Sequence, residues 1–198
     1  MDSVPADVPI YVTTRAVLDK IAGFPMHRGV LAIGLRGDSP TIDDLLDGVG
    51  DTATLVVCVG IANHDNIGAI FRNAAAFGAD AVLVDRTCCD PLYRKAIRVS
   101  VGAVLKIPFC TFDDGDTLVT SLAARQFRQF ALTPAGANDI RSVSRGARTA
   151  LYLGAEGPGL PSSLIGRLVG TRISMAEDFD SLNVAAASAI ALHCLARR

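Results

Sequence analysis

Three segments place polar side chains and glycines where an apolar run passes into a helix-like run. They are NHDNIGAIFRNAAAFG at 63–78, LYLGAEGPGLP at 151–161 and RISMAEDFDSLNVAAA at 172–187. In the first segment, Asn66 is placed to cap the helix predicted to follow it. Arg72 lies in this otherwise apolar helix, where a guanidinium either extends to solvent or faces a site. A planar guanidinium is suited to contacts with phosphate.

The second and third segments are loops with a predicted strand before them. Gly154, Gly157 and Gly159 allow positive φ angles and a close approach of backbone to a ligand, although a plain turn explains them equally well. Their spacing is neither the dinucleotide-binding form of GxGxxG nor a Walker P-loop, which needs Lys-Ser/Thr. In the third segment, Ser181 is a plausible N-cap of the final helix, and Asn183 is then expected in its first turn.

Strand-like and helix-like segments alternate from residue 54 onward, which favours a parallel α/β sheet with helices on both faces. Such sheets bind ligands at the carboxyl ends of their strands. The predicted strands are Thr54–Ile61, Ala81–Val84, Leu105–Phe109, Phe127–Leu132, Ala150–Leu153 and Arg172–Met175. The predicted helices are Asn66–Phe77, Arg94–Val101, Thr117–Arg125, Pro161–Leu168 and Ser181–Ala196. Residues 1–50 do not fit this scheme, and Gly34–Gly50 has the Gly and Asp content of a linker.

The composition indicates a folded protein with a sizeable core, because 50% of the 198 residues are hydrophobic and 20% are charged. No run of about 18 uncharged apolar residues is present, so no membrane span is expected, and the acidic N-terminus does not have the form of a signal peptide. The five cysteines include no CxxC pair, which predicts reduced thiols, no metal site and a cytoplasmic location. The net charge of −1 excludes a strong overall attraction to nucleic acid.

Taken together and in this order, the three segments resemble the SpoU (TrmH-like) family of RNA ribose 2′-O-methyltransferases, within the SPOUT superfamily. The matching motifs are NIGAIFRNAAAFG, LGAEGPGL, and ISM followed by DSLNVAAA; DPLYRKAIRVSVGAVLKIPF between them is also similar to a segment of that family. The resemblance covers residues 54–198. It implies a parallel α/β sheet with a C-terminal deep trefoil knot, S-adenosylmethionine as cofactor, and a homodimer with the active site at the subunit interface.

The resemblance also implies a reaction, the transfer of a methyl group to a ribose 2′-hydroxyl of rRNA or tRNA without a metal. Arg72 is then either the general base, a role to which a guanidinium is poorly suited because it keeps its proton in proteins, or an anchor for the neighbouring phosphate. Asn66 and Glu156 are expected to hold Arg72. The implied catalytic residues are Arg72, Asn66, Glu156, Ser181 and Asn183. The implied cofactor-binding residues are Thr133, Gly154, Ile173, Met175, Leu182 and Asn183. The residues expected to contact RNA are Arg98, Arg94 and Lys95.

Two alternatives stay open. One is a catalytically inactive SPOUT-fold RNA-binding protein, against which the retained polar residues of the three motifs argue. The other is a nucleotide- or NAD-binding α/β enzyme, which the missing GxGxxG and the missing acidic ribose partner disfavour. His64 is a further candidate base, although a polar loop residue is its simpler interpretation. The adjacent Cys88 and Cys89 have no evident role.

The N-terminal segment is the largest departure from the family pattern. Ile10–Ile33 looks like the tail of an RNA-recognition domain that many family members carry, followed by its linker. We therefore expect two parts, an N-terminal extension and linker at 1–50 and a methyltransferase domain at 51–198. The extension is either the tail of a truncated RNA-recognition domain or a segment with another role.

Overall fold

The chain is described by a computed structural model, which covers residues 4–5, 7–26, 29–179 and 181–196. It divides into two compact units, Met1–Asp38 and Ser39–Arg198. The described residues of the first unit contain one helix, α1 (Arg15–Ala22), which ends at Gly23 in the left-handed conformation and buries none of its residues. Within the described ranges, no helix is both long and apolar enough to cross a bilayer.

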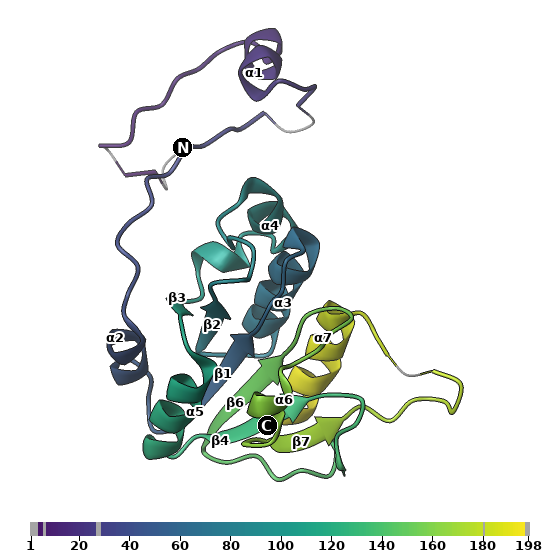
Figure 1. The fold of residues 1–198 in the computed structure, drawn as a ribbon. Helices are drawn as coiled ribbons and strands as arrows, with labels where there is room; N and C mark the ends of the chain where they lie inside the picture. The colour runs from purple at the N-terminus through teal and green to yellow at the C-terminus, as the bar shows by residue number, and fades with distance from the viewer. Residues whose placement is uncertain (1–3, 6, 27–28, 180, 197–198) are drawn as a thin grey trace. The chain divides into compact units, whose positions relative to one another are not determined.

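A fully parallel sheet of seven strands organises the second unit (Figure 1). The order across the sheet is β3-β2-β1-β6-β4-β7-β5, so β6 lies in the centre and pairs with β1 on one side and β4 on the other. The class expected from the sequence, a parallel α/β sheet flanked by helices, is confirmed. The strands are β1 (Ala53–Cys58), β2 (Ala81–Asp85), β3 (Phe109–Phe112), β4 (Arg128–Leu132), β5 (Asn138–Asp139), β6 (Arg148–Leu153) and β7 (Val169–Arg172).

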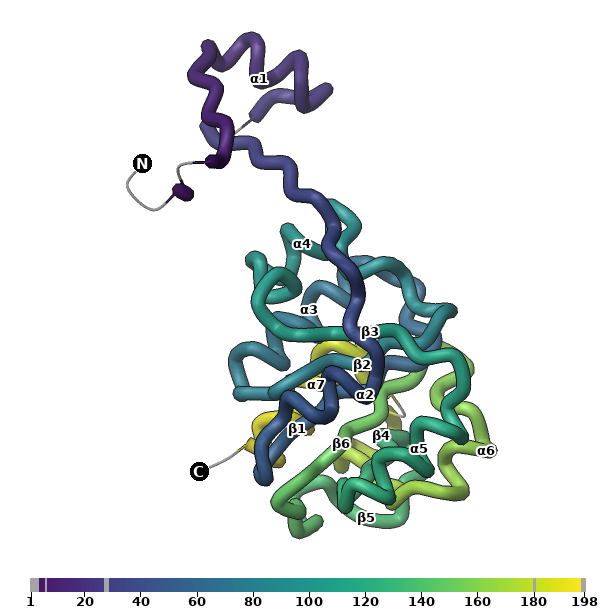
Figure 2. The backbone as a smooth tube through the Cα atoms, turned by 90° about the vertical axis from the view of Figure 1, so that its left-hand side faces the viewer, coloured from purple at the N-terminus to yellow at the C-terminus, as the bar shows by residue number. Residues whose placement is uncertain are grey.

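Helices cover both faces of this sheet (Figures 1 and 2). Successive side chains of a strand point to opposite faces, and β1 divides its residues accordingly. Val56 and Cys58 pack in the core with α3, α4 and α7, whereas Leu55 and Val57 pack with α2, α5 and α6. The helices are α2 (Ile42–Asp47), α3 (His64–Ala76), α4 (Arg94–Val99), α5 (Gly115–Ala124), α6 (Ser162–Ile165) and α7 (Val184–Leu195), with a 3₁₀ turn η1 (Ala103–Leu105).

Two predicted strands are displaced along the chain. The strand predicted at Leu105–Phe109 begins only at Phe109, because η1 occupies its start and Pro108 has no N–H to donate; the Pro108 carbonyl instead accepts from the Val82 amide at 3.0 Å. The strand predicted at Arg172–Met175 is β7, which ends at Arg172. Its position is fixed by backbone pairing to β4 and β5 rather than by an apolar run.

The predicted linker at Gly34–Gly50 contains a short helix that packs on the sheet. Helix α2 begins with a capping box, in which Thr41 accepts from the Asp44 amide and the Asp44 carboxylate accepts from the Thr41 amide. Leu45 and Leu46 are buried in the same core as α5. The Gly and Asp content therefore marked the ends of a helix rather than an unstructured connection.

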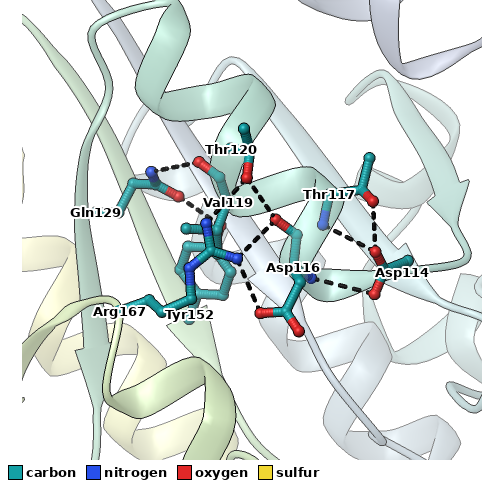
Figure 3. Close-up of polar contacts among 8 residues, drawn as sticks. All are labelled: Asp114, Asp116, Thr117, Val119, Thr120, Gln129, Tyr152 and Arg167. Carbon is teal, nitrogen blue, oxygen red and sulfur yellow. Dashed lines mark hydrogen bonds and ion pairs between the residues drawn. The ribbon is translucent and has the colours of Figure 1, made fainter.

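A buried polar contact fixes β6 to its neighbours (Figure 3). The Tyr152 hydroxyl of β6 donates to Gln129 Oε1 of β4 at 2.6 Å, and Gln129 Nε2 donates to the Val119 carbonyl of α5 at 3.0 Å. Burial raises the pKa of Tyr152 well above its ordinary value. The central strand, the neighbouring strand and α5 are thus held in one register by two hydrogen bonds.

The segment after α6 is held to the same helix (Figure 3). The Arg167 guanidinium donates to the Asp116 carbonyl at 3.0 Å, to Asp116 Oδ1 at 2.9 Å and to Thr120 Oγ1 at 2.9 Å. Since Tyr152 lies just before the glycine-rich loop and Arg167 lies just after α6, both sides of that loop are connected to α5.

Candidate functional site

A cavity of about 380 Å³ lies at the carboxyl ends of β4 and β6, where the segments after β4, β6 and β7 meet. Its volume falls within the range of about 300–1,000 Å³ that is usual for small-ligand sites. All six residues expected to bind a cofactor line it, namely Thr133, Gly154, Ile173, Met175, Leu182 and Asn183. Three of the expected catalytic residues line it, since Glu156 and Ser181 join Asn183, which belongs to both expected sets.

Backbone forms one wall of this cavity, because the loop after β6 folds back on itself. Ala155 and Gly159 form an antiparallel bridge, and a Cβ at Gly154 would lie 2.3 Å from the carbonyl carbon of Gly159 and from the amide nitrogen of Leu160. Gly157 has a φ of 87° and lines the same cavity. The glycines of the second motif are therefore required by close approach at residue 154 and by positive φ at residue 157.

Asn183 joins the three sequence motifs at one point. Its Oδ1 accepts from the amides of Ala185 at 2.9 Å and Ala186 at 3.3 Å, which caps α7. Its Nδ2 donates to Asn66 Oδ1 at 3.0 Å and to Glu156 Oε1 at 2.9 Å. One amide thus fixes the start of α7, the first turn of α3 and the glycine-rich loop relative to one another.

The two predicted helix caps were wrong by a few residues. The final helix begins at Val184, so Asn183 and not Ser181 is its N-cap. Likewise α3 begins at His64, and its N-cap is Asn63, whose Oδ1 accepts from the Asp65 amide at 2.8 Å. Asn66 is therefore inside the helix and only 5% exposed, and its side chain is directed at Asn183.

Arg72 is exposed on α3 and does not line the cavity. The expected contacts from Asn66 and Glu156 to Arg72 are not made, since both side chains bind Asn183 instead. Among the described residues, Arg72 has no hydrogen-bonding or ion-pair partner. A guanidinium in this state can bind an anion without first breaking an internal contact.

Two residues that the sequence analysis did not single out connect α3 to α7. Asn73 Nδ2 donates to the Ala185 carbonyl and to Ser188 Oγ, both at 2.8 Å, and the buried Ser188 hydroxyl donates to the same carbonyl at 2.7 Å. The sequence signal was an amide and a hydroxyl within alanine-rich helical runs, where each needs a partner. This contact holds the helix that carries Arg72 against the helix that Asn183 caps.

The predicted RNA-contacting residues lie on α4, away from the cavity lining. Arg94, Lys95 and Arg98 are all exposed. Lys95 Nζ lies 2.6 Å from Asp65 Oδ2 at the start of α3, with both side chains about half exposed, so this ion pair contributes little to stability.

Cys88 has a structural role. Its Sγ accepts from the Ile61 amide at 3.2 Å and donates to the Cys58 carbonyl at 3.4 Å, and burial raises the pKa of its thiol to about 12. The thiol is thus a neutral hydrogen-bonding group at the end of β1. Among the described residues, no group of three His, Cys, Asp or Glu side chains is placed to hold a metal ion.

Comparison with known proteins gives one family match. The sequence profile of the SpoU rRNA Methylase family matches residues 53–193. An uncharacterized tRNA/rRNA methyltransferase of Mycobacterium bovis is 40% identical over 192 residues, which are 93% of this chain and 65% of the relative. The 23S rRNA (guanosine-2′-O-)-methyltransferase RlmB of Bordetella pertussis is 31% identical over 180 residues, which are 89% of this chain and 73% of the relative.

Solved structures have the same fold. An AdoMet-bound rRNA methyltransferase from Sinorhizobium meliloti superposes with a TM-score of 0.68 at 28% identity, covering 72% of this chain and 55% of that one. The SpoU methyltransferase AviRb from Streptomyces viridochromogenes, in complex with AdoMet, gives a TM-score of 0.73 at 23% identity over 79% of this chain and 61% of that one. The present chain spans 65% of the length of the mycobacterial relative.

Proposed function

Because the chain belongs to the SpoU rRNA methylase family, we propose that it is an S-adenosylmethionine-dependent RNA methyltransferase that acts on a ribose 2′-hydroxyl of rRNA or tRNA. The observation that carries the proposal is the cavity at the carboxyl ends of β4 and β6, lined by all six residues expected to bind the cofactor. The relative RlmB, named as a guanosine 2′-O-methyltransferase, supports the ribose hydroxyl as the acceptor.

The residues of the cavity fit S-adenosylmethionine. Leu132, Leu153, Ile173 and Met175 offer apolar contacts to a flat base, and Gly154, Gly157 and Gly159 line the cavity without a side chain. When bound, this cofactor supplies a methyl group already activated on a sulfonium.

The polar residues have distinct roles in this proposal. Arg72 anchors the phosphate next to the acceptor ribose, since its guanidinium is exposed and has no partner among the described residues. Asn183 holds Asn66 and Glu156, so that the three motifs keep a fixed geometry around the acceptor hydroxyl. Ser181 lines the cavity beside them. Positioning of this kind supplies up to about 7–11 kcal/mol of a reaction barrier.

The proposal includes a C-terminal trefoil knot, a homodimer and an RNA-binding surface on α4. A C-terminal trefoil knot is supported by close passage of the chain at Gly136, where a Cβ would lie 2.3 Å from the carbonyl carbon of Thr171 in β7. A homodimer is supported by Ile190 on α7 and Leu182, which are apolar and substantially exposed. RNA binding uses Arg94, Lys95 and Arg98 of α4.

The proposal also covers the domain boundaries of the chain and its location in the cell. We assign residues 1–50 to an N-terminal extension and linker and residues 51–198 to the methyltransferase domain, with α2 of the linker packed in the core of that domain. A cytoplasmic location agrees with the five free cysteines.

Calorimetric titration with S-adenosylmethionine, with NAD as the control ligand, tests the cofactor. Micromolar binding, near −8 kcal/mol, is expected for S-adenosylmethionine and none for NAD. The reaction is then tested by incubating the protein and cofactor with unmodified rRNA and tRNA and analysing the nucleosides. Formation of 2′-O-methylated nucleosides is expected. Binding of NAD in preference to S-adenosylmethionine, or methylation of a base atom instead of the ribose, would overturn the proposal.

A further inference from the structure

A pair of rings, of which His64 is partly buried and Tyr93 is exposed, lies outside the cavity, between α3 and α4. The rings of His64, the first residue of α3, and Tyr93, the residue before α4, have centroids 4.3 Å apart and planes inclined by 42°. Although it packs on His64, Tyr93 remains 51% exposed. A ring pair that served only the core would be covered, whereas this one keeps aromatic surface in contact with solvent.

The topology places this ring pair at the same edge of the sheet as the cavity. Helix α3 follows β1 and α4 follows β2, and both strands run parallel to β4 and β6, whose carboxyl ends form the cavity. His64 is two residues before Asn66, which binds Asn183 of the cavity lining. An RNA strand bound along this edge can therefore place one nucleotide at the cavity and a neighbouring nucleotide on the rings.

The charges around the rings are those of a nucleic-acid-binding surface. Arg94, Lys95 and Arg98 follow Tyr93 directly on α4 and are exposed. The carboxylate of Asp65, the residue after His64, is paired with Lys95 Nζ at 2.6 Å. Exposed aromatic rings beside cationic side chains bind single-stranded nucleic acid, because the rings stack on bases while the cations contact phosphates.

We propose that His64 and Tyr93 form a stacking platform for an unpaired nucleobase of the RNA substrate, close to the nucleotide that is methylated. This inference rests on the proposed function and adds to it a requirement for a single-stranded or loop substrate, since a base must be unstacked from its neighbours to lie on the platform. Stacking contributes little sequence preference, because every base has a flat π-face.

The test compares two fluorescent oligonucleotides of the same length, about 12 nucleotides, by anisotropy. One is a single-stranded RNA of mixed sequence, and the other has the same backbone without bases. Tyr93→Ala is expected to weaken binding of the first by roughly 5- to 100-fold, the loss usual for one stacked base, and to leave binding of the second unchanged. Tyr93→Phe keeps the ring and should retain the affinity. His64→Ala should weaken binding of the RNA as well.

Matched controls separate stacking from other effects. Arg98→Ala should weaken binding of both oligonucleotides alike, because phosphate contacts do not depend on bases. The urea midpoint and the affinity for S-adenosylmethionine should not change in Tyr93→Ala. Equal RNA affinity of wild-type protein and Tyr93→Ala, or an equal loss for both oligonucleotides, would overturn the platform. If the protein methylates RNA but Tyr93→Ala binds normally, only the platform fails; if Tyr93→Ala loses RNA affinity but no methylation is found, only the reaction fails.

Discussion

Replacing Gly154 by alanine tests whether the glycine-rich loop has to fold back on itself to form the cavity. A Cβ at residue 154 would lie 2.3 Å from two backbone atoms, in Gly159 and Leu160, whereas ordinary contacts begin near 3.4 Å. The two limbs of the loop must therefore separate by about 1 Å, the difference between these distances. The limb that contains Gly159 and Leu160 does not yield easily, because Leu160 is buried in the same core as α5 and Arg167 fixes the following segment to that helix.

The magnitude follows from the cost of overpacking, about 1–3 kcal/mol when the surroundings are well packed. We expect Gly154→Ala to lower the free energy of unfolding by about 2–3 kcal/mol, measured by urea denaturation with far-ultraviolet circular dichroism. Since the displaced backbone is a wall of the cavity, the affinity for S-adenosylmethionine should fall by roughly tenfold or more, which is about 1.4 kcal/mol.

Gly157→Ala is the matched control in the same loop. Gly157 also lines the cavity, and no heavy atom lies within 4 Å of a Cβ built there, but its φ of 87° strains any other residue. That strain alone costs about 1–2 kcal/mol, and the cavity wall need not move. A Gly154→Ala variant that is as stable as Gly157→Ala and binds S-adenosylmethionine within twofold of wild type would refute this account of the loop.

Other substitutions probe the remaining contacts. Asn183→Ala removes the N-cap of α7 and the donor to the buried Asn66, so the free energy of unfolding in urea should fall by about 2 kcal/mol; a fall of less than about 0.5 kcal/mol would contradict the joining role of this residue. Arg72→Ala should abolish methyl transfer and leave calorimetric affinity for S-adenosylmethionine within a few-fold, and Arg72→Lys should not restore transfer. Loss of cofactor binding in Arg72→Ala would assign that arginine a structural role instead. Gln129→Leu breaks two buried hydrogen bonds and should cost about 2–3 kcal/mol of unfolding free energy, whereas Tyr152→Phe breaks one and should cost about 1 kcal/mol; equal losses in urea would refute this ranking.

The side-chain pattern predicts a strand well where the strand is a buried run of apolar, β-branched residues. The apolar, β-branched run at Thr54–Ile61 forms β1, buried along its whole length. The pattern fails for β7, whose sequence VGTR has little apolar character and whose residues extend because they pair with β4 and β5. The place of β6 in the centre of the sheet is likewise a property of long-range pairing, which no local periodicity records.

In the candidate site, the sequence predicted the residues that line the cavity but not the hydrogen bonds between them. The motifs contained the types of residue that line the cavity, and all six expected cofactor-binding positions lie together there. The partners of the polar side chains could not be obtained from the motifs, because the Asn183 amide reaches Asn66 across 117 residues of sequence. The cap positions depended on where each helix begins, and a shift of two residues moved the N-cap of the final helix from Ser181 to Asn183.

The central position of β6 also affects the chain while it is being synthesised. Synthesis proceeds from the N-terminus, so β1 and β4 leave the ribosome before Arg148–Leu153. Until those residues emerge, β1 and β4 each lack the neighbour that β6 supplies, and their apolar edges are open to pairing with other chains. The nascent protein is therefore prone to aggregation until Arg148–Leu153, about three quarters of the way along the 198 residues, have emerged, and a chain that stops before residue 148 would keep both edges exposed.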